Sequence, residues 1–425
     1  MEKHLKTILL VLFSSFMSVG WGQNCVDGVE VELWGECYNI EETTYLNLYN
    51  SGLTGEIPPE IGNLINLNHL ELDHNNLIGE IPSEIGNLIN LNHLELDHNN
   101  LTGEIPPEIG NLTNLNHLGL YVNQLTGQIP SEIYNLTNLV SLIINNNQLV
   151  GVLSSEIENL INLRYLHLYN NFLYGSIPSE IGNLTDLESI HLGWNLMNGQ
   201  VPSEIGNLIN LRELILISNS FTGEIPYGIW EIENLIYLVL GGNSLSGQIP
   251  IEVGNLVNLV EFNLWGNNLS GVIPIEIGNL INVERIFIDG NNLSGSIPEN
   301  IGFLPNLVSL GLHYNNLSGL IPESLCDLSI NWEIWEESYS SISNNNLCPP
   351  YPSCIENYVG NQDTSECVEC LDGDINGDSS LNILDLVSIS NLILDNGYDE
   401  CSDINSDGEL NILDLVTLVN IILGI

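Results

Sequence analysis

A glycine recurs every 24 residues through most of this chain, and this spacing constrains the fold more than any other feature. A fixed period of this length is typical of a solenoid, in which each repeat forms one coil of a stack. Because one coil cannot bury its apolar side alone, consecutive coils must pack against one another. The recurring residues are Gly55, Gly79, Gly103, Gly127, Gly151, Gly175, Gly199, Gly223, Gly247, Gly271, Gly295 and Gly319.

One repeat, residues 63–86, reads NLINLNHLELDHNNLIGEIPSEIG. Leu70 and Leu72 alternate with polar residues, which predicts a short strand that points both leucines inward. Asn75 and its equivalents follow the strand in every repeat but the first, which has Ser51. Backbone groups in a buried turn need partners, and an amide side chain supplies them from inside the coil. The recurring Ile-Pro pairs predict an extended outer segment, because proline has no N–H for a ladder.

The frame L-x-x-L-x-L-x-x-N-x-L-x-G-x-I-P-x-x-I-G-N-L resembles the leucine-rich repeat, in the 24-residue class of plant receptors and polygalacturonase inhibitors. The resemblance covers about residues 45–348 and implies an α/β solenoid, a horseshoe or superhelix with a parallel β-sheet on its concave face. It also implies about twelve repeats at 45–325, between an N-terminal cysteine cap at 24–44 and a C-terminal one at 326–354.

Outward-facing strand positions should form columns along the concave face, because parallel strands stack about 4.8 Å apart. Eight of the nine histidines fall in these columns, and only His4 does not. Aromatic residues gather there too; sugars stack on such rings and proteins use them as contacts, although scattered surface aromatics are also ordinary. We therefore predict a face that binds a protein or a glycan. Its predicted residues are His69, His93, His117, Tyr121, Tyr165, His167, Tyr169, His191, Trp194, Tyr237, Trp265, Phe287, His313 and Tyr314.

The first two full repeats are near-copies that place Glu71 beside Glu95 and Asp73 beside Asp97, all expected to point outward. Adjacent like charges cost free energy and raise a pKa. Protonated histidines could offset this charge, and so could a divalent cation held by imidazole and carboxylate ligands. A solvated polar end produced by repeat duplication is the favoured interpretation. The histidines concerned are His69, His74, His93 and His98.

Charge argues against two classes of partner. The chain has 54 acidic residues and 5 basic ones, a formal net charge of −49. Such a surface repels nucleic acid and anionic membranes and suits cations, neutral glycans or basic partners, although solubility explains it equally well. Beyond the N-terminal segment no run of about 18 apolar residues occurs, so no membrane span is expected.

Residues 1–23 are predicted to be a secretory signal peptide. A basic start, from Lys3 to Lys6, precedes the apolar run TILLVLFSSFMSVG, and small residues allow cleavage near Gln23. Lipid attachment at Cys25 is a weaker alternative. The protein is therefore expected to be secreted, and extracellular or associated with a cell surface.

An even number of cysteines in a secreted chain indicates disulfide bonds. Cys25 and Cys37 are the expected N-terminal pair, and the pairing of the other six stays open. A redox role for the segment from Cys367 to Cys370 is less favoured in an oxidising compartment. The eight cysteines are Cys25, Cys37, Cys326, Cys348, Cys354, Cys367, Cys370 and Cys401.

After a polar linker at about 355–371, two segments match each other: DINGDSSLNILDLVSISNLIL and DINSDGELNILDLVTLVNIIL. Each begins with acidic and amide side chains at the spacing that wraps a Ca²⁺ ion, and an apolar helix follows. Two calcium ions are therefore predicted. Their predicted ligands are Asp374, Asn376, Asp378, Ser380, Asn382 and Asp385, then Asp403, Asn405, Asp407, Glu409, Asn411 and Asp414.

These segments, about residues 372–425, resemble the type I dockerin, a duplicated calcium loop–helix module that docks onto cohesin domains of polysaccharide-degrading assemblies. The resemblance implies a small all-α, EF-hand-like domain and a cohesin-like scaffold as partner. Ser379 departs from the usual loop glycine, and the helices lack late Lys or Arg. A calcium-stabilised module that anchors the protein otherwise is the alternative. The positions implied for partner docking are Ile383, Leu384, Ile412 and Leu413.

Catalysis is not expected, because the chain has no Ser/His/Asp order, nucleotide loop or zinc motif. The leading interpretation is a secreted recognition or adhesion protein that binds its ligand on the concave face and attaches through the calcium module. The alternative is a component or regulator of an extracellular polysaccharide-degrading complex. A repeat fold alone fixes no function.

Overall fold

The computed structural model describes residues 25–332, 340–365, 381–395 and 410–423, together with 367, 373, 375 and 402–404. The chain divides into two compact units, Met1–Gln362 and Asp363–Ile425. The predicted signal peptide lies outside the described residues. None of the described helices is both long and apolar enough to cross a membrane.

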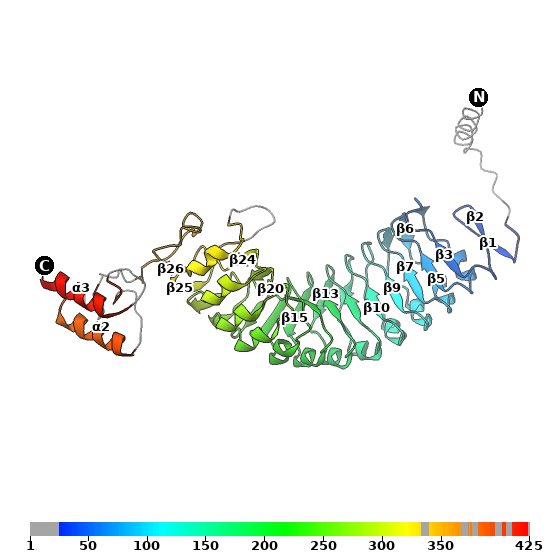
Figure 1. The fold of residues 1–425 in the computed structure, drawn as a ribbon. Coiled ribbons are helices and arrows are strands. Elements are labelled where there is room, and N and C mark those ends of the chain that lie inside the picture. Colours follow the sequence, from blue (N-terminus) through cyan, green and yellow to red (C-terminus); the bar gives the residue numbers. More distant parts are fainter. Residues whose placement is uncertain are drawn as a thin grey trace, which may run out of the picture. The chain divides into compact units, whose positions relative to one another are not determined.

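Twelve short strands, one from each coil, form a single parallel sheet along the concave side of the first unit (Figure 1). Each residue pairs with the residue 24 positions later, as His69 does with His93, which confirms the predicted columns. The strands are β3 (Tyr45–Asn47), β5 (His69–Glu71), β7 (His93–Glu95), β9 (His117–Gly119), β10 (Ser141–Ile143), β12 (Tyr165–His167), β14 (Ser189–His191), β16 (Glu213–Ile215), β18 (Tyr237–Val239), β20 (Glu261–Asn263), β22 (Arg285–Phe287) and β24 (Ser309–Gly311).

The opposite side of each coil carries a 3₁₀ helix, and no α-helix occurs in the described part of the repeats, contrary to the α/β expectation. Only five residues separate the proline from the next leucine, which is room for a tight 3₁₀ segment. The 3₁₀ helices are η1 (Pro59–Asn63), η2 (Ser83–Asn87), η3 (Pro107–Asn111), η4 (Ser131–Asn135), η5 (Ser155–Asn159), η6 (Ser179–Asn183), η7 (Ser203–Asn207), η8 (Tyr227–Glu231), η9 (Ile251–Asn255), η10 (Ile275–Asn279), η11 (Glu299–Phe303) and η12 (Glu323–Asp327).

A second set of short strands runs between the asparagine turn and the Ile-Pro pair, in three smaller parallel sheets. The proline is not in these ladders but caps the 3₁₀ helix, as Pro82 does for η2. The recurring glycine has a left-handed backbone here: Gly79 has φ 77°, and a Cβ would lie 2.8 Å from the Glu56 Cγ. The strands are β4 (Thr54–Gly55), β6 (Asn76–Glu80), β8 (Asn100–Thr102), β11 (Val150–Gly151), β13 (Phe172–Gly175), β15 (Leu196–Gln200), β17 (Ser220–Glu224), β19 (Ser244–Ser246), β21 (Ser270–Val272), β23 (Asn292–Gly295), β25 (Asn316–Leu320) and β26 (Asn346–Cys348).

The asparagine of each turn bonds to backbone groups from inside the coil, as predicted, and it also joins that coil to the preceding one. The Asn75 Nδ2 donates to the carbonyl oxygens of Leu48 at 2.8 Å and Leu72 at 2.9 Å. Its Oδ1 accepts from the Leu53 N–H at 2.9 Å. This series of asparagine contacts extends one coil further than the 24-residue period indicates. Asn345 makes the same contacts after a longer last coil.

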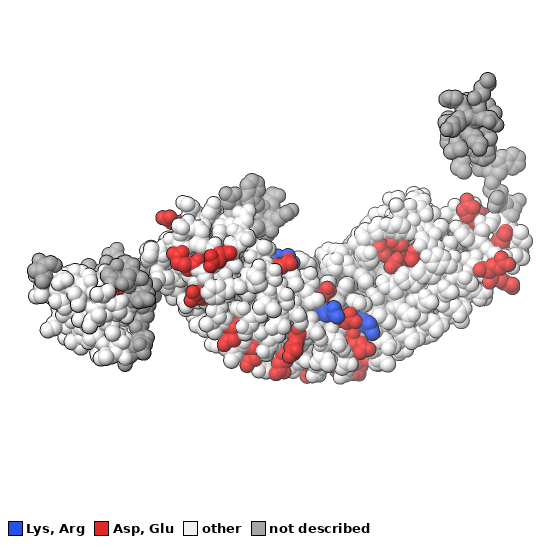
Figure 2. Space-filling model, in the orientation of Figure 1, with Lys and Arg blue, Asp and Glu red and all other residues white. Residues whose placement is uncertain are grey.

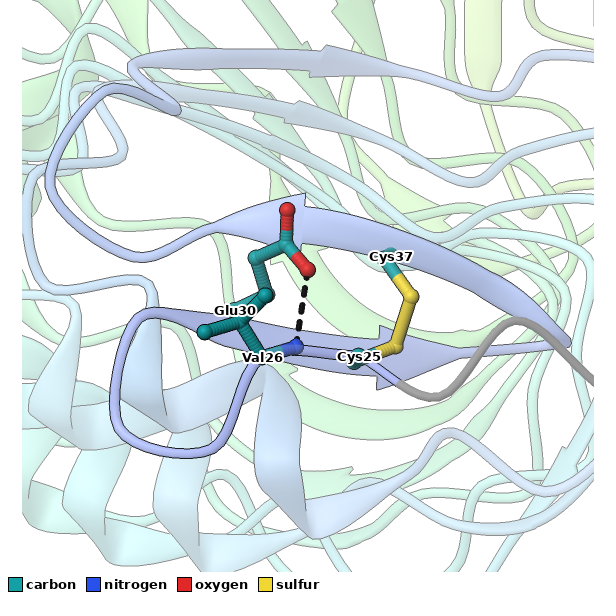
Figure 3. Close-up of a disulfide and its surroundings, with 4 residues drawn as sticks. All are labelled: Cys25, Val26, Glu30 and Cys37. Atoms are coloured by element: carbon teal, nitrogen blue, oxygen red, sulfur yellow. Dashed lines mark hydrogen bonds between the residues drawn. A yellow bond between two sulfur atoms is a disulfide. The ribbon is translucent and has the colours of Figure 1, made fainter.

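The N-terminal cap is a hairpin of β1 (Glu30–Leu33) and β2 (Glu36–Asn39). The predicted Cys25–Cys37 disulfide is present, and the Val26 N–H donates to the Glu30 carboxylate beside it at 2.9 Å (Figure 3). Leu33 is fully buried. The hairpin therefore covers the apolar end of the stack that the first coil would otherwise expose.

The C-terminal cap closes the other end of the stack through a disulfide between Cys326 and Cys354. Ile355 and Val359 are buried, and the Gln362 amide donates to the carbonyl oxygen of Ile342 at 3.0 Å. Residues 355–362 therefore belong to the cap, and the linker predicted at 355–371 begins too early. Of the remaining cysteines, Cys348 and Cys367 are disulfide-bonded, and Cys370 and Cys401 lie outside the described residues.

The second unit contains α2 (Ile383–Asp395) and α3 (Ile412–Leu423), which contact each other. Ile389 of α2 and Leu418 of α3 are fully buried. These are the two apolar helices that the duplicated segments predict. Several predicted calcium ligands lie outside the described residues: Asp374, Asn376, Asp378, Ser380, Asn405, Asp407 and Glu409.

Candidate binding face

The outward side chains of the twelve-stranded sheet, with those of the second and third positions after each strand, define the concave face. All fourteen predicted binding residues lie on this face, and six of them are histidines. The other two histidines of the described chain, His74 and His98, lie on it as well. The sequence prediction omitted the first coil, whose Tyr45, Asn47 and Tyr49 also lie on this face. Counting one period back from His69 would have found them. Four of the predicted aromatic residues are exposed: Tyr165, Trp194, Trp265 and Tyr314.

The third position after each strand is constrained by its backbone. That backbone is left-handed, with φ 50° at Trp194 and 52° at Tyr314. Glycine fits this conformation easily, as at Gly242, whereas a bulky residue there costs roughly 1–3 kcal/mol. Large aromatic side chains at this position therefore favour a role in binding over a role in folding.

The aspartates of the first two full repeats were expected to be exposed, but they are buried. Asp73 is 5% exposed and Asp97 is 1% exposed. Each carboxylate contacts the next histidine, with 3.0 Å from the His74 Nδ1 to the Asp73 Oδ2 and the same distance from His98 to Asp97. Burial raises the pKa of Asp97.

Two columns of stacked rings flank the carboxylates of the first coils. In one, Tyr45, His69, His93 and His117 stack with centroid separations of 4.5, 4.3 and 4.6 Å. In the other, the stacked rings of His74 and His98 are 4.1 Å apart. The 24-residue register alone brings these rings together, because each residue lies directly above its copy.

A polar cluster occupies the middle of the face, where the rings of His167 and His191 stack 4.1 Å apart. The His191 Nε2 lies 2.9 Å from the Glu213 Oε2, and the Ser189 hydroxyl donates to the same oxygen at 2.7 Å. Burial lowers the pKa of His167 to about 4. The hydrogen bond from His191 lowers the pKa of Glu213 to about 2. The Glu213 carboxylate therefore keeps its negative charge on this face. The sequence analysis did not include Glu213 among the predicted binding residues.

A pocket of about 470 Å³ lies near the C-terminal end of the face. Trp265 and Phe287 form part of its lining, beside Asn263, Asp289 and His313. The Trp265 ring lies against Gly241, where a Cβ would be 2.3 Å from the Trp265 Cδ1, so only glycine admits this ring position. Burial raises the pKa of Asp289, and His313 opposes that shift from 3.4 Å. Asn263 and Asp289 stand in the predicted columns, but nothing in their spacing indicated a pocket.

Comparison with family models identifies a leucine-rich repeat region at residues 34–151. Further leucine-rich repeats match at 162–184, 234–256, 258–280, 282–304 and 306–328. No curated protein sequence matches the chain.

Among solved structures, the chain is similar to the plant peptide hormone receptor RGFR1 in complex with RGF2. The two are 37% identical with a TM-score of 0.64, over 71% of this chain and 52% of the receptor. The PEPR1–AtPEP1 structure is 33% identical with a TM-score of 0.67, over 73% of this chain and 47% of that one. The chain thus spans about half the length of these receptor structures.

A leucine-rich repeat protein of Leptospira interrogans is similar over most of its own length. It is 33% identical to this chain with a TM-score of 0.57, over 75% of this chain and 82% of that protein.

Proposed function

This chain belongs to the leucine-rich repeat family, and on that premise we propose that it is a non-catalytic recognition protein whose concave face binds an extended, basic peptide segment. The disulfides at both caps indicate an extracellular or cell-surface location for this encounter. One similar structure is a plant peptide hormone receptor in complex with RGF2, which supports a peptide as the class of ligand.

The pocket of Trp265, Phe287 and Asp289 carries this proposal. Aromatic faces attract a cation through their quadrupoles, and a partly buried carboxylate pairs with it. An Arg or Lys side chain therefore meets both needs of the pocket, with its stem against the rings and its charge beside Asp289. The charge of the whole chain favours the same sign, because it has 54 acidic residues and 5 basic ones, and acidic side chains outnumber basic ones on the face drawn in Figure 2.

A second contact region would hold the rest of the segment. Tyr165, Tyr169 and Trp194 lie on the concave face beside the polar cluster, and the rings of Tyr169 and Trp194 are 6.4 Å apart. Trp194 lies three coils from Trp265, or ~14 Å along the sheet, which an extended peptide spans with about four residues. We propose that these rings receive an apolar residue of the same peptide.

Replacing Trp265 with alanine should weaken peptide binding at least about tenfold, a loss of ~1.4 kcal/mol. The full chain would be used to select from a random peptide library, and the enriched peptides would be titrated by calorimetry. Enrichment of Arg or Lys is expected. Phe303→Ala is the matched control, because Phe303 is exposed but lies on η11, outside the sheet. Selection of acidic peptides, or equal binding by Trp265→Ala, would refute the proposal. Selective binding to a glycan array would indicate the other ligand class.

For the second unit we propose a calcium-dependent docking module. Asp385 and Asp414 are fully buried at equivalent positions in the first turns of α2 and α3. The Asp385 carboxylate accepts from the N–H groups of Ile375 at 3.0 Å and Asn382 at 2.8 Å, and Asp414 accepts from Asn411 at 2.9 Å. Buried carboxylates favour a bound cation, which supplies the opposite charge.

The first turns of α2 and α3 also present a surface that a partner could contact. Exposed apolar pairs next to the buried aspartates occupy matching places on the two helices, which suits a symmetric contact. A cohesin-like scaffold is therefore the second candidate partner, and a pull-down with a cohesin domain in calcium tests it. The exposed residues are Ile383, Leu384, Ile412 and Leu413.

Chelation of calcium from the full chain should reduce the helical circular dichroism signal, and added Ca²⁺ should restore it. The signal reports chiefly on α2 and α3, because the described repeats contain only short 3₁₀ helices. Asp385→Asn should weaken the calcium dependence by removing a charged ligand, whereas Asp327→Asn in η12 serves as a control outside the module. Helicity that is unchanged by the chelator would contradict calcium binding.

A further inference from the structure

Three side chains on β7 and β9 converge on one point of the concave face. The Glu95 Oε1 lies 3.4 Å from the His93 Nε2 and 3.3 Å from the His117 Nε2. One ligand atom from each residue lies within 4.8 Å of the other two. Two imidazole nitrogens and one carboxylate oxygen at such separations form a donor set suited to zinc and similar divalent ions.

Buried polar atoms at this point form no well-aligned hydrogen bond among the described residues, although both imidazole nitrogens lie within ion-pair distance of Glu95. They are the His93 Nε2, the His117 Nε2 and the Asp97 Oδ1, and Asp97 is almost fully buried. The preceding coil is different, because the Glu71 carboxylate is 2.6 Å from the His69 Nε2 and also accepts from the Asn47 amide. A buried polar atom without a well-formed hydrogen bond is destabilising, and a bound ion would satisfy it.

The strand β9 has no side chain beside these atoms. Its third residue is Gly119, where β5 and β7 carry glutamates. A Cβ on Gly119 would lie 3.1 Å from the His117 Nε2 and 3.5 Å from the Asp97 Oδ1. The His117 Nε2 and the Asp97 Oδ1 therefore both face Gly119, and a side chain there would crowd them and the Glu95 side chain.

We propose that His93, Glu95 and His117 bind a divalent metal ion of the zinc class. The local charge supports a cation, since Glu71, Asp73, Glu95 and Asp97 share these coils. The arginines of the described chain, Arg164, Arg212 and Arg285, all belong to later coils. An all-oxygen donor set would instead suit calcium or magnesium. The site is distinct from the peptide pocket and does not depend on it.

Calorimetric titration of the full, calcium-saturated chain with Zn²⁺ tests the proposal. One zinc ion should bind at this site, and His117→Gln and Glu95→Gln should each weaken its binding at least about tenfold. Glu84→Gln is the matched control, because Glu84 is an exposed glutamate on η2 and should leave zinc binding unchanged. Circular dichroism of each variant checks that it is folded.

Cobalt substitution gives a second readout that does not depend on heat. Co²⁺ bound to imidazole and carboxylate ligands should produce visible absorption that His117→Gln changes. The proposal is overturned if the full chain binds no zinc. It is also overturned if His117→Gln and Glu95→Gln bind zinc as tightly as the unchanged chain, or if Glu84→Gln weakens binding equally.

Discussion

Replacement of Asn195 by alanine is expected to lower the free energy of unfolding by about 3–5 kcal/mol, because it leaves several buried backbone groups without partners. The Asn195 Nδ2 donates to the carbonyl oxygens of Leu168 and Leu192, both at 3.1 Å. Its Oδ1 accepts from the Leu173 N–H at 3.0 Å. One side chain thus joins two neighbouring coils, and alanine replaces none of these contacts.

Urea denaturation of the two proteins measures this loss. Asn198→Ala is the matched control, because Asn198 belongs to the same coil but its side chain is exposed on β15. The control should change the free energy of unfolding by less than about 0.5 kcal/mol. A loss below about 1 kcal/mol for Asn195→Ala would show that water replaces the amide in the turn.

Trp230→Ala should cost about 3–5 kcal/mol, the range for removal of a fully buried aromatic ring. Most 3₁₀ helices have glycine at this position, as at Gly62, where a Cβ would lie 2.4 Å from the Glu84 carbonyl oxygen. In η8 the tryptophan is 1% exposed, and its ring centroid lies 6.3 Å from that of Phe262 in the next coil. Alanine would leave a large cavity between these coils.

Thermal and urea denaturation of Trp230→Ala would measure the effect of that cavity. Tyr227→Ala provides the comparison, since Tyr227 starts the same 3₁₀ helix and is exposed. It should cost less than about 1 kcal/mol. If both variants lose equal stability, then the 3₁₀ helix itself, and not the packing of the Trp230 ring, is what the substitution disturbs.

The concave face could be predicted in outline, but its contacts could not. A strict 24-residue period places His69 beside His93, and Glu71 beside Glu95, whatever the details of the coil. It does not say which residues are buried or which conformation the backbone adopts. Asp73 was expected at the surface because it alternates with leucines, yet it is buried and its carboxylate contacts His74. The pocket also depends on a residue of the preceding coil, since the Trp265 ring can lie where it does only because Gly241 has no side chain.

The solenoid, its parallel sheet, the recurring asparagine contacts and the Cys25–Cys37 pair could all be predicted before folding is considered, because each follows from a regular period or from short separation along the chain. The Cys326–Cys354 pair, the extra coil at Asn345 and the convergence of His93, Glu95 and His117 emerge only in the folded molecule. These features depend on how side chains from different coils are oriented and how deeply they are buried. A repeat pattern fixes the spacing between coils, but the space left between their side chains arises only when the coils pack.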